Sequence, residues 1–106
     1  MERFLEEFGD SVGYWHDVGH AENLERLGFT PHIDWLKTLG HRMIGVHLHD
    51  INTLADHKAP GKGDLNLRAI APYVPDEAIR VCELTSGNSE EDIRAGIAVL
   101  RQAGLI

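Results

Sequence analysis

Three short apolar segments, spaced by about one strand–helix repeat, constrain the fold of this 106-residue chain more than any other feature. They are Val12–Asp17, Met43–Asp50 and Ala78–Leu84, and each is rich in β-branched or aromatic side chains, which are typical of buried strands. Between these segments, apolar residues recur at the spacing of a helix. Strands that alternate with helices predict a parallel sheet. Because the chain is long enough for one compact domain and too short for two, we expect one α/β unit over residues 1–106.

Capping and turn residues predict where the intervening helices begin and end. Helix starts are expected at Thr30 before Pro31, at Asp64, and at Ser89, whose spacing to Asp92 resembles a capping box. A helix over residues 20–29 would bury Leu24 and Leu27 and would end at Gly28. The polar residues 51–65, which include glycine and proline, are expected to form a loop.

The charge and composition argue against several classes of protein. The formal net charge is −7, from 17 acidic and 10 basic residues, which disfavours binding to a nucleic-acid backbone. No stretch approaches the roughly 18 uninterrupted apolar residues of a membrane helix, and the acidic residues that follow Met1 are not those of a signal peptide. The single cysteine, Cys82, cannot form an internal disulfide, which predicts a protein of the reducing cytoplasm.

Histidine is unusually frequent for a chain of this length, and it is both the commonest metal ligand in proteins and the side chain that titrates closest to neutral pH. The 7 histidines are His16, His20, His32, His41, His47, His49 and His57. We expect His16 to face the helices, and His32 and His41 to lie on the solvated surface.

Three polar side chains stand at or near the carboxyl ends of the predicted strands: Asp17, His47 and Glu83. Along the sequence, each is about one strand–helix repeat from the next. The carboxyl ends of parallel strands meet at the edge of the sheet where α/β proteins bind ligands, so these side chains should converge. Two carboxylates and an imidazole suit a divalent cation such as Mn²⁺, Zn²⁺, Co²⁺ or Mg²⁺. The alternative is structural: Asp17 caps the following helix, while His47 and His49 are buried polar groups with satisfied hydrogen bonds.

Strand alternation predicts which face carries the chemistry. One face of the second strand would hold Met43, Gly45, His47 and His49, and the other face would hold Ile44, Val46 and Leu48 beneath helices. Trp15 shares the face of Asp17, where it would either form an apolar wall for a sugar or pack in the core.

Four sequence strings, YWHDVGH, IGVHLHD, HKAPGKGDLN and VCELTSG, occur in this order over about residues 12–86. They resemble the C-terminal part of the xylose isomerase-like family, which shows Asp-x-x-His at one strand end, His-x-x-Asp at the next, a loop closing with Gly-x-Gly, and Glu on the last strand. This family of TIM barrels contains sugar and sugar-phosphate isomerases and epimerases, and endonuclease IV is a relative. The resemblance implies a partial (β/α)8 TIM barrel of about three parallel strand–helix units, the last three of the family barrel, with residues 1–106 as its C-terminal fragment.

The resemblance also implies roles for individual residues. Asp17, His47 and Glu83 would be the metal ligands, and Glu83 would in addition be a catalytic acid or base. The substrate-binding positions would include His20, His57 and Lys62, and in endonuclease-like members the first two are also ligands. Ala55 stands where those members carry an aspartate, which argues against a nuclease.

The function implied by the resemblance is that of a divalent-metal-dependent sugar or sugar-phosphate isomerase or epimerase, which moves a proton through an enediolate. Five strands of the family barrel and a further ligand glutamate have no counterpart in this sequence. The chain would therefore associate with itself as a homo-oligomer or with a complementary barrel chain. The alternative is a non-catalytic metal-binding or association module derived from the family, and an endonuclease IV-like nuclease ranks below both.

Overall fold

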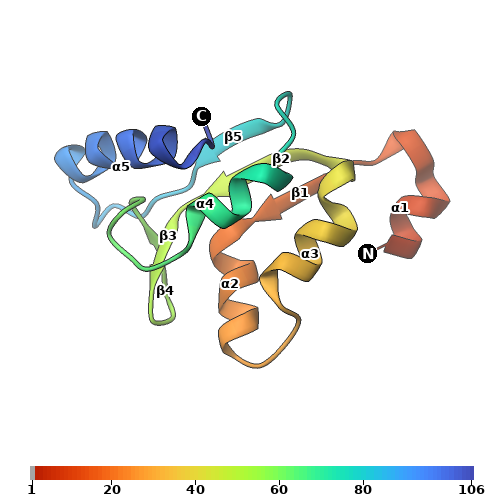
Figure 1. Cartoon of the computed structure of the whole chain (residues 1–106), viewed down its shortest axis with the longest axis horizontal. Coiled ribbons are helices and arrows are strands. Elements are labelled where there is room, and N and C mark those ends of the chain that lie inside the picture. Colours follow the sequence, from red (N-terminus) through yellow and green to blue (C-terminus); the bar gives the residue numbers. More distant parts are fainter. Residues whose placement is uncertain (1) are drawn as a thin grey trace.

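The computed structural model describes residues 2–106 as a three-stranded parallel sheet with helices packed on it (Figure 1). The strands are β1 (Tyr14–Asp17), β2 (Met43–Leu48) and β5 (Ile79–Cys82), and their order β1-β2-β5 places β2 at the centre. Both neighbouring pairs are parallel. The predicted α/β class and the three predicted strand segments are therefore confirmed, with each strand a little shorter than the sequence indicated.

The described residues form five α-helices: α1 (Glu2–Phe8), α2 (Val18–Arg26), α3 (His32–Leu39), α4 (Leu67–Ile70) and α5 (Glu90–Ala103). The hydrophobic core lies between the helices and one face of the sheet, and Leu36, Val46, Leu48 and Leu100 are almost completely buried in it. Among residues 2–106, none of the helices has the length and apolar character needed to cross a membrane.

The other face of the sheet is open. Its exposed apolar side chains are Trp15, Ile44, Ile79 and Val81, with exposed fractions of 40%, 55%, 59% and 38%. We call these four residues the open face. The strand register aligns Trp15 with Gly45 and Ile79, and aligns Asp17 with His47 and Val81, so the open face is continuous with the predicted metal ligands.

A bulge at the start of β2 breaks the predicted alternation. Met43 pairs with Tyr14 and Gly45 pairs with Trp15, so Ile44 is an extra residue opposite β1. The bulge places Met43 in the core and leaves Ile44 exposed, which is the reverse of the sequence prediction. From Gly45 onward the alternation holds, because the register with both neighbouring strands is then regular.

Two predicted helix boundaries are confirmed. Ser89 and Asp92 form a reciprocal capping box at the start of α5. Gly28 follows the end of α2 with φ of 88°, a left-handed conformation that favours glycine. However, Leu24 and Leu27 are exposed rather than buried, because the buried positions of α2 lie in its first turn.

Two other helix starts differ from the prediction. Thr30 does not cap α3; Pro31 holds the cap position, and the carboxylate of Glu25 accepts the backbone N–H of His32 at 2.8 Å. Asp64 does not cap α4, because Asn66 does.

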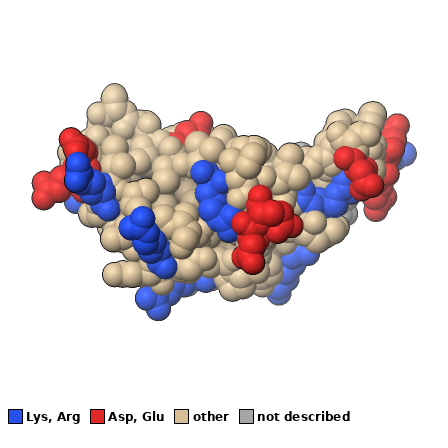
Figure 2. Space-filling model, turned by 90° about the horizontal axis from the view of Figure 1, so that it is seen from above, with Lys and Arg blue, Asp and Glu red and all other residues tan. Residues whose placement is uncertain are grey.

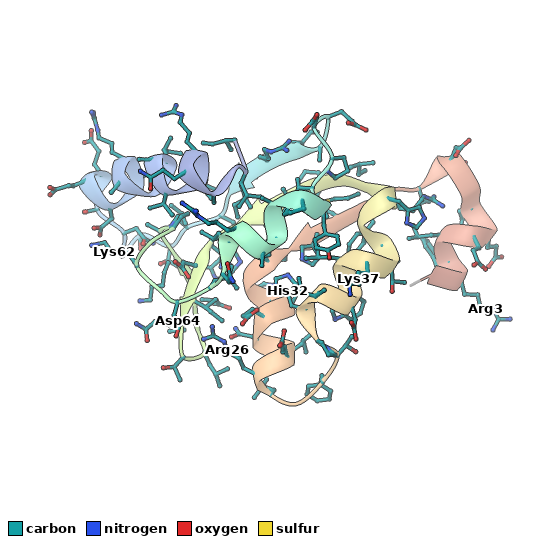
Figure 3. All side chains as sticks on the ribbon, viewed as in Figure 1. Arg3, Arg26, His32, Lys37, Lys62 and Asp64 are labelled. Atoms are coloured by element: carbon teal, nitrogen blue, oxygen red, sulfur yellow. The ribbon has the colours of Figure 1, made fainter. Side chains whose placement is uncertain are left out.

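The carboxylate of Asp64 instead accepts a hydrogen bond from Arg26 of α2 at 2.7 Å (Figure 3). This ion pair attaches the loop that precedes α4 to the end of α2. Asp64 therefore acts on the packing of the loop and not on the start of the helix.

The predicted loop of residues 51–65 contains an antiparallel hairpin of β3 (Asp50–Asn52) and β4 (Ala55–Lys58). Asp50 organises it: this buried carboxylate accepts the backbone N–H groups of Ile51, Gly61 and Leu65 at 2.9–3.0 Å. A polar hairpin held by one buried acid has no apolar alternation, which explains why the pattern of the sequence indicates only a loop.

His32 is buried, with 3% of its surface exposed, although the sequence favoured a surface position. Its Nε2 lies 2.8 Å from Nε2 of His16, which is completely buried on the helix-facing side of β1 as predicted. The O–H of Tyr14 lies 2.8 Å from Nδ1 of His16, and Nδ1 of His32 lies 3.1 Å from Glu22. Both ring nitrogens of each imidazole thus have a partner, and the contact between His16 and His32 joins residues that are 16 apart in the sequence, whereas His41 is exposed as predicted.

Candidate metal centre

The structure brings Asp17, His47 and Glu83 together at the carboxyl edge of the sheet. His47 Nδ1 lies 3.5 Å from Asp17 Oδ2 and 3.2 Å from Glu83 Oε2, and the three potential ligand atoms all lie within 4.8 Å of one another. The predicted convergence of these side chains is confirmed, while their role as ligands stays a prediction.

Strand register explains the convergence. Asp17 and His47 are direct partners in the β1–β2 ladder, and His47 pairs with Val81 in the β2–β5 ladder. Glu83 lies two residues after Val81 and therefore returns to the same face. Its backbone N–H also donates to the carbonyl oxygen of Leu48 at 3.2 Å, which extends the parallel pairing to the glutamate.

The spacing of these atoms fits ligands of one cation. Metal–oxygen and metal–nitrogen bonds of about 2.1 Å place neighbouring ligand atoms about 3.0–3.4 Å apart in octahedral or tetrahedral geometry. The separations of His47 Nδ1 from the Glu83 and Asp17 oxygens, 3.2 and 3.5 Å, lie close to this range, and the two carboxylate oxygens lie within 4.8 Å of each other. The donor set of two carboxylates and one imidazole can therefore hold a divalent ion with little movement.

Asp17 is held in its ionised form. Burial alone would raise the pKa of this carboxyl, but the hydrogen bonds from His49 and from the backbone N–H of His20 outweigh it, so the pKa lies well below its ordinary value. These two bonds measure 2.7 and 2.9 Å, and both end on Oδ1. Asp17 therefore caps α2, as the structural alternative proposed, and also belongs to the convergent cluster.

A second group of imidazoles adjoins the first. His20, His49 and His57 each offer a nitrogen atom within 4.8 Å of the others. His57 Nε2 lies 3.5 Å from Glu83 Oε2, and His20 Nδ1 lies 3.3 Å from Asp17 Oδ2. His20 and His57, the predicted substrate-binding residues, thus border the three-residue cluster.

Asp56, which follows Ala55 in the sequence, adjoins this second group. Its carboxylate lies 2.8 Å from His57 Nδ1 and 3.3 Å from His20 Nε2. The hydrogen bond to His57 lowers the pKa of Asp56. Burial alone would lower the pKa of His57, but the hydrogen bond to Asp56 and the nearby acidic charges outweigh burial, so the pKa of His57 is raised. The backbone of His57 is in the left-handed region, with φ of 56°.

Trp15 lies against the cluster and not in the core. The centres of its ring and the His47 ring are 5.4 Å apart in an edge-to-face arrangement. Gly45 makes room for the indole, because a Cβ at that position would lie 2.4 Å from the Trp15 ring. The indole is therefore not packed in the core, and its role as an apolar wall for a sugar stays a prediction.

Lys62 is placed beside the cluster but not within it. Its ammonium group pairs with Asp92 of α5 at 3.0 Å. Lys62 and Lys58 line a cavity of about 380 Å³ between the β3–β4 hairpin and the loop after β5. The backbone N–H of Thr85, which also lines this cavity, donates to the carbonyl oxygen of His57 at 3.3 Å, so the cavity borders the group of imidazoles.

Comparison of the chain with known protein families, with characterised proteins and with solved structures finds no match.

Proposed function

We propose that this chain holds a divalent metal ion between Asp17, His47 and Glu83. The observation that carries the proposal is the convergence of three suitable ligand atoms within 4.8 Å, each delivered by a different strand of one parallel sheet. The low pKa of Asp17 supports it, because a ligand carboxylate must be ionised. Mn²⁺, Zn²⁺, Co²⁺ and Mg²⁺ are the candidate ions, since mixed oxygen and nitrogen donors accept each of them.

We further propose that the centre serves a sugar or sugar-phosphate isomerase or epimerase. The four strings that resemble the xylose isomerase-like family support this, together with the position of their acidic and imidazole residues around one cluster. A bound divalent cation would polarise the carbonyl and hydroxyl oxygens of the sugar and stabilise negative charge on them. Under this proposal the fold is the last part of a (β/α)8 barrel.

In this proposal Glu83 transfers the proton. Its carboxylate takes the proton from the carbon beside the carbonyl as the enediolate forms, and the family glutamate that has no counterpart in this sequence would be the other acid–base group, which supplies the returning proton. The side chain is 45% exposed, and its Oε2 faces both His47 and His57. His20 and His57 would donate hydrogen bonds to sugar hydroxyls, and the Trp15 indole would pack on the apolar side of the sugar.

The open face supports association with further strands. Three parallel strands cannot close a barrel, and each apolar side chain of the open face, about half exposed, would gain roughly half of the 1.5–3 kcal/mol that complete burial of such a side chain provides. We propose that a second copy of this chain or a complementary barrel chain covers it. A non-catalytic metal-binding or association module is the second candidate, favoured by the presence of only three ligands and one acid–base carboxylate among the described residues.

The proposed partner is a small molecule, and nucleic acid is disfavoured. On the face drawn in Figure 2, lysine and arginine side chains are separated by uncharged surface, and some of them lie beside acidic ones, instead of forming one basic patch. Together with the net charge of −7, this distribution opposes binding along a phosphate backbone. We also propose a cytoplasmic location, supported by the unpaired thiol of Cys82.

Calorimetric titration with Mn²⁺ and Zn²⁺ tests the metal proposal. We expect saturable binding of one ion by the wild-type chain, lost in the double variant His47→Ala, Glu83→Ala. The matched control is His41→Ala, which removes an exposed histidine outside the cluster and should bind as the wild type does. Equal binding by the double variant and the wild type would contradict the proposal.

An isomerase assay separates the two candidate functions. Proton exchange into a panel of aldoses, ketoses and their phosphates is measured in deuterated water, with metal present. Exchange by the chain, alone or with a complementary barrel chain, supports the enzyme. Metal binding without exchange in either condition supports the non-catalytic module.

A further inference from the structure

His49 is completely buried where β2 leads into the β3–β4 hairpin, and both of its ring nitrogens have partners. Nδ1 lies 2.9 Å from the backbone nitrogen of His57, and Nε2 lies 2.7 Å from Oδ1 of Asp17. The ring therefore connects a strand-end carboxylate with the backbone of a neighbouring hairpin.

The two contacts fix the tautomer of His49. A backbone N–H can only donate a hydrogen bond, so Nδ1 is the acceptor and carries no proton. The single proton of the neutral imidazole is then on Nε2, from which it is donated to Asp17. A ring with both nitrogens engaged in this way has no lone pair free for a metal ion.

We propose that His49 is a positioning residue of the metal centre, which orients Asp17 and is not itself a ligand. This inference rests on the proposed function, in which Asp17 binds the ion. The His49 ring and the backbone N–H of His20 both hold Oδ1, which leaves Oδ2 facing His47 Nδ1 at 3.5 Å and His20 Nδ1 at 3.3 Å. Residues that hydrogen-bond to a metal ligand, without contacting the metal themselves, fix the orientation of that ligand and raise the affinity for the metal.

Three elements hold the His49 ring in this place. It stacks on the ring of His57, with centres 4.4 Å apart and planes inclined by 1°. A Cβ at Gly19 in α2 would lie 2.0 Å from Cε1 of the ring, so the absence of a side chain there is required. Because β1, α2 and β4 all contact the imidazole, movement of the hairpin would be transmitted to the Asp17 carboxylate.

Two substitutions of His49 separate positioning from ligation. His49→Gln keeps an oxygen that accepts from the His57 N–H and an amide N–H that donates to Asp17, whereas His49→Leu keeps neither. We expect His49→Leu to weaken Co²⁺ binding by about 10- to 100-fold and His49→Gln to stay within about threefold of wild type. His32→Leu is the matched control, because it removes a buried histidine outside the cluster and should leave Co²⁺ affinity unchanged.

Two outcomes of this series would overturn the inference. Wild-type affinity in a folded His49→Leu variant would show that the imidazole does not orient the carboxylate. A loss in His49→Gln as large as that in His49→Leu would show that the imidazole itself is a ligand.

Imidazole ¹⁵N NMR spectra of the full chain, recorded before and after addition of Zn²⁺, give a readout that needs no variant. We expect His49 to have an unprotonated Nδ1 and a protonated Nε2 in both spectra. A protonated Nδ1 in the metal-free chain, or loss of the Nε2 proton with zinc, would overturn the inference. Absence of any Zn²⁺ binding would instead refute the proposed function, so the two failures are distinguishable.

Discussion

The buried pair of His16 and His32 makes the stability of this protein depend on pH in a predictable window. Burial, with a smaller contribution from the charge of His32, lowers the pKa of His16 from 6.5 to about 4, against a weaker opposing effect of Asp17. The unfolded imidazole takes up its proton near pH 6.5 and the folded one only near pH 4, so unfolding is favoured as the pH falls between these values. Above pH 6.5 the His16 ring is neutral in both the folded and the unfolded chain, so it no longer lowers the free energy of unfolding.

The expected loss follows from the size of this change. A pKa lowered from 6.5 to about 4 corresponds to about 3 kcal/mol between pH 7 and pH 4. That is a large part of the roughly 5–15 kcal/mol by which small domains are stable. Two other groups also make the stability depend on pH. The lowered pKa of Asp17 means that protonation of its carboxylate below about pH 4 destabilises the folded state. The raised pKa of His57 stabilises the folded state at low pH, and this contribution is lost as the pH rises.

Urea unfolding followed by tryptophan fluorescence, from pH 7 to pH 4, measures this loss. The variant His16→Gln removes the titrating ring, so its free energy of unfolding should fall by about 3 kcal/mol less than that of wild type over this range. The exposed His41→Gln serves as control and should follow the wild type. Parallel curves for wild type and His16→Gln would refute the reasoning.

Three further predictions concern the capping box, the indole and the open face. Ser89→Ala removes the cap of α5 and should lower the free energy of unfolding by about 1 kcal/mol in urea. Gly45→Ala places a methyl group 2.4 Å from the Trp15 ring, so it should cost about 1–3 kcal/mol and shift the tryptophan emission. Light scattering should show the chain as a dimer or larger oligomer at micromolar concentration. The double variant Ile44→Lys, Ile79→Lys should be monomeric, and a stable, folded wild-type monomer of 11.8 kDa would contradict the assembly proposal.

The sequence predicts those parts of the fold that local chemistry decides. The segments that contain β1, β2 and β5 are recognisable because β-branched and aromatic residues gather in them. The convergence of Asp17, His47 and Glu83 follows because parallel strands end at one edge. Ser89 and Asp92 form their capping box from residues that are only three apart.

The remaining features depend on contacts between distant residues. Ile44 becomes exposed because of a bulge set by pairing with β1, and no local pattern encodes that extra residue. His32 is buried because His16, half a repeat earlier, supplies a partner for its ring. Asp56 meets the imidazoles of His57 and His20 from the β3–β4 hairpin, which the sequence pattern indicates only as a loop.

The most direct test of the metal centre is X-ray diffraction from crystals of the Zn²⁺-loaded chain, with data collected at the zinc absorption edge. The account predicts one anomalous peak about 2 Å from Asp17 Oδ2, His47 Nδ1 and Glu83 Oε2, with His49 still bonded to Asp17. A peak held by other histidines, or no peak at a saturating zinc concentration, would contradict it.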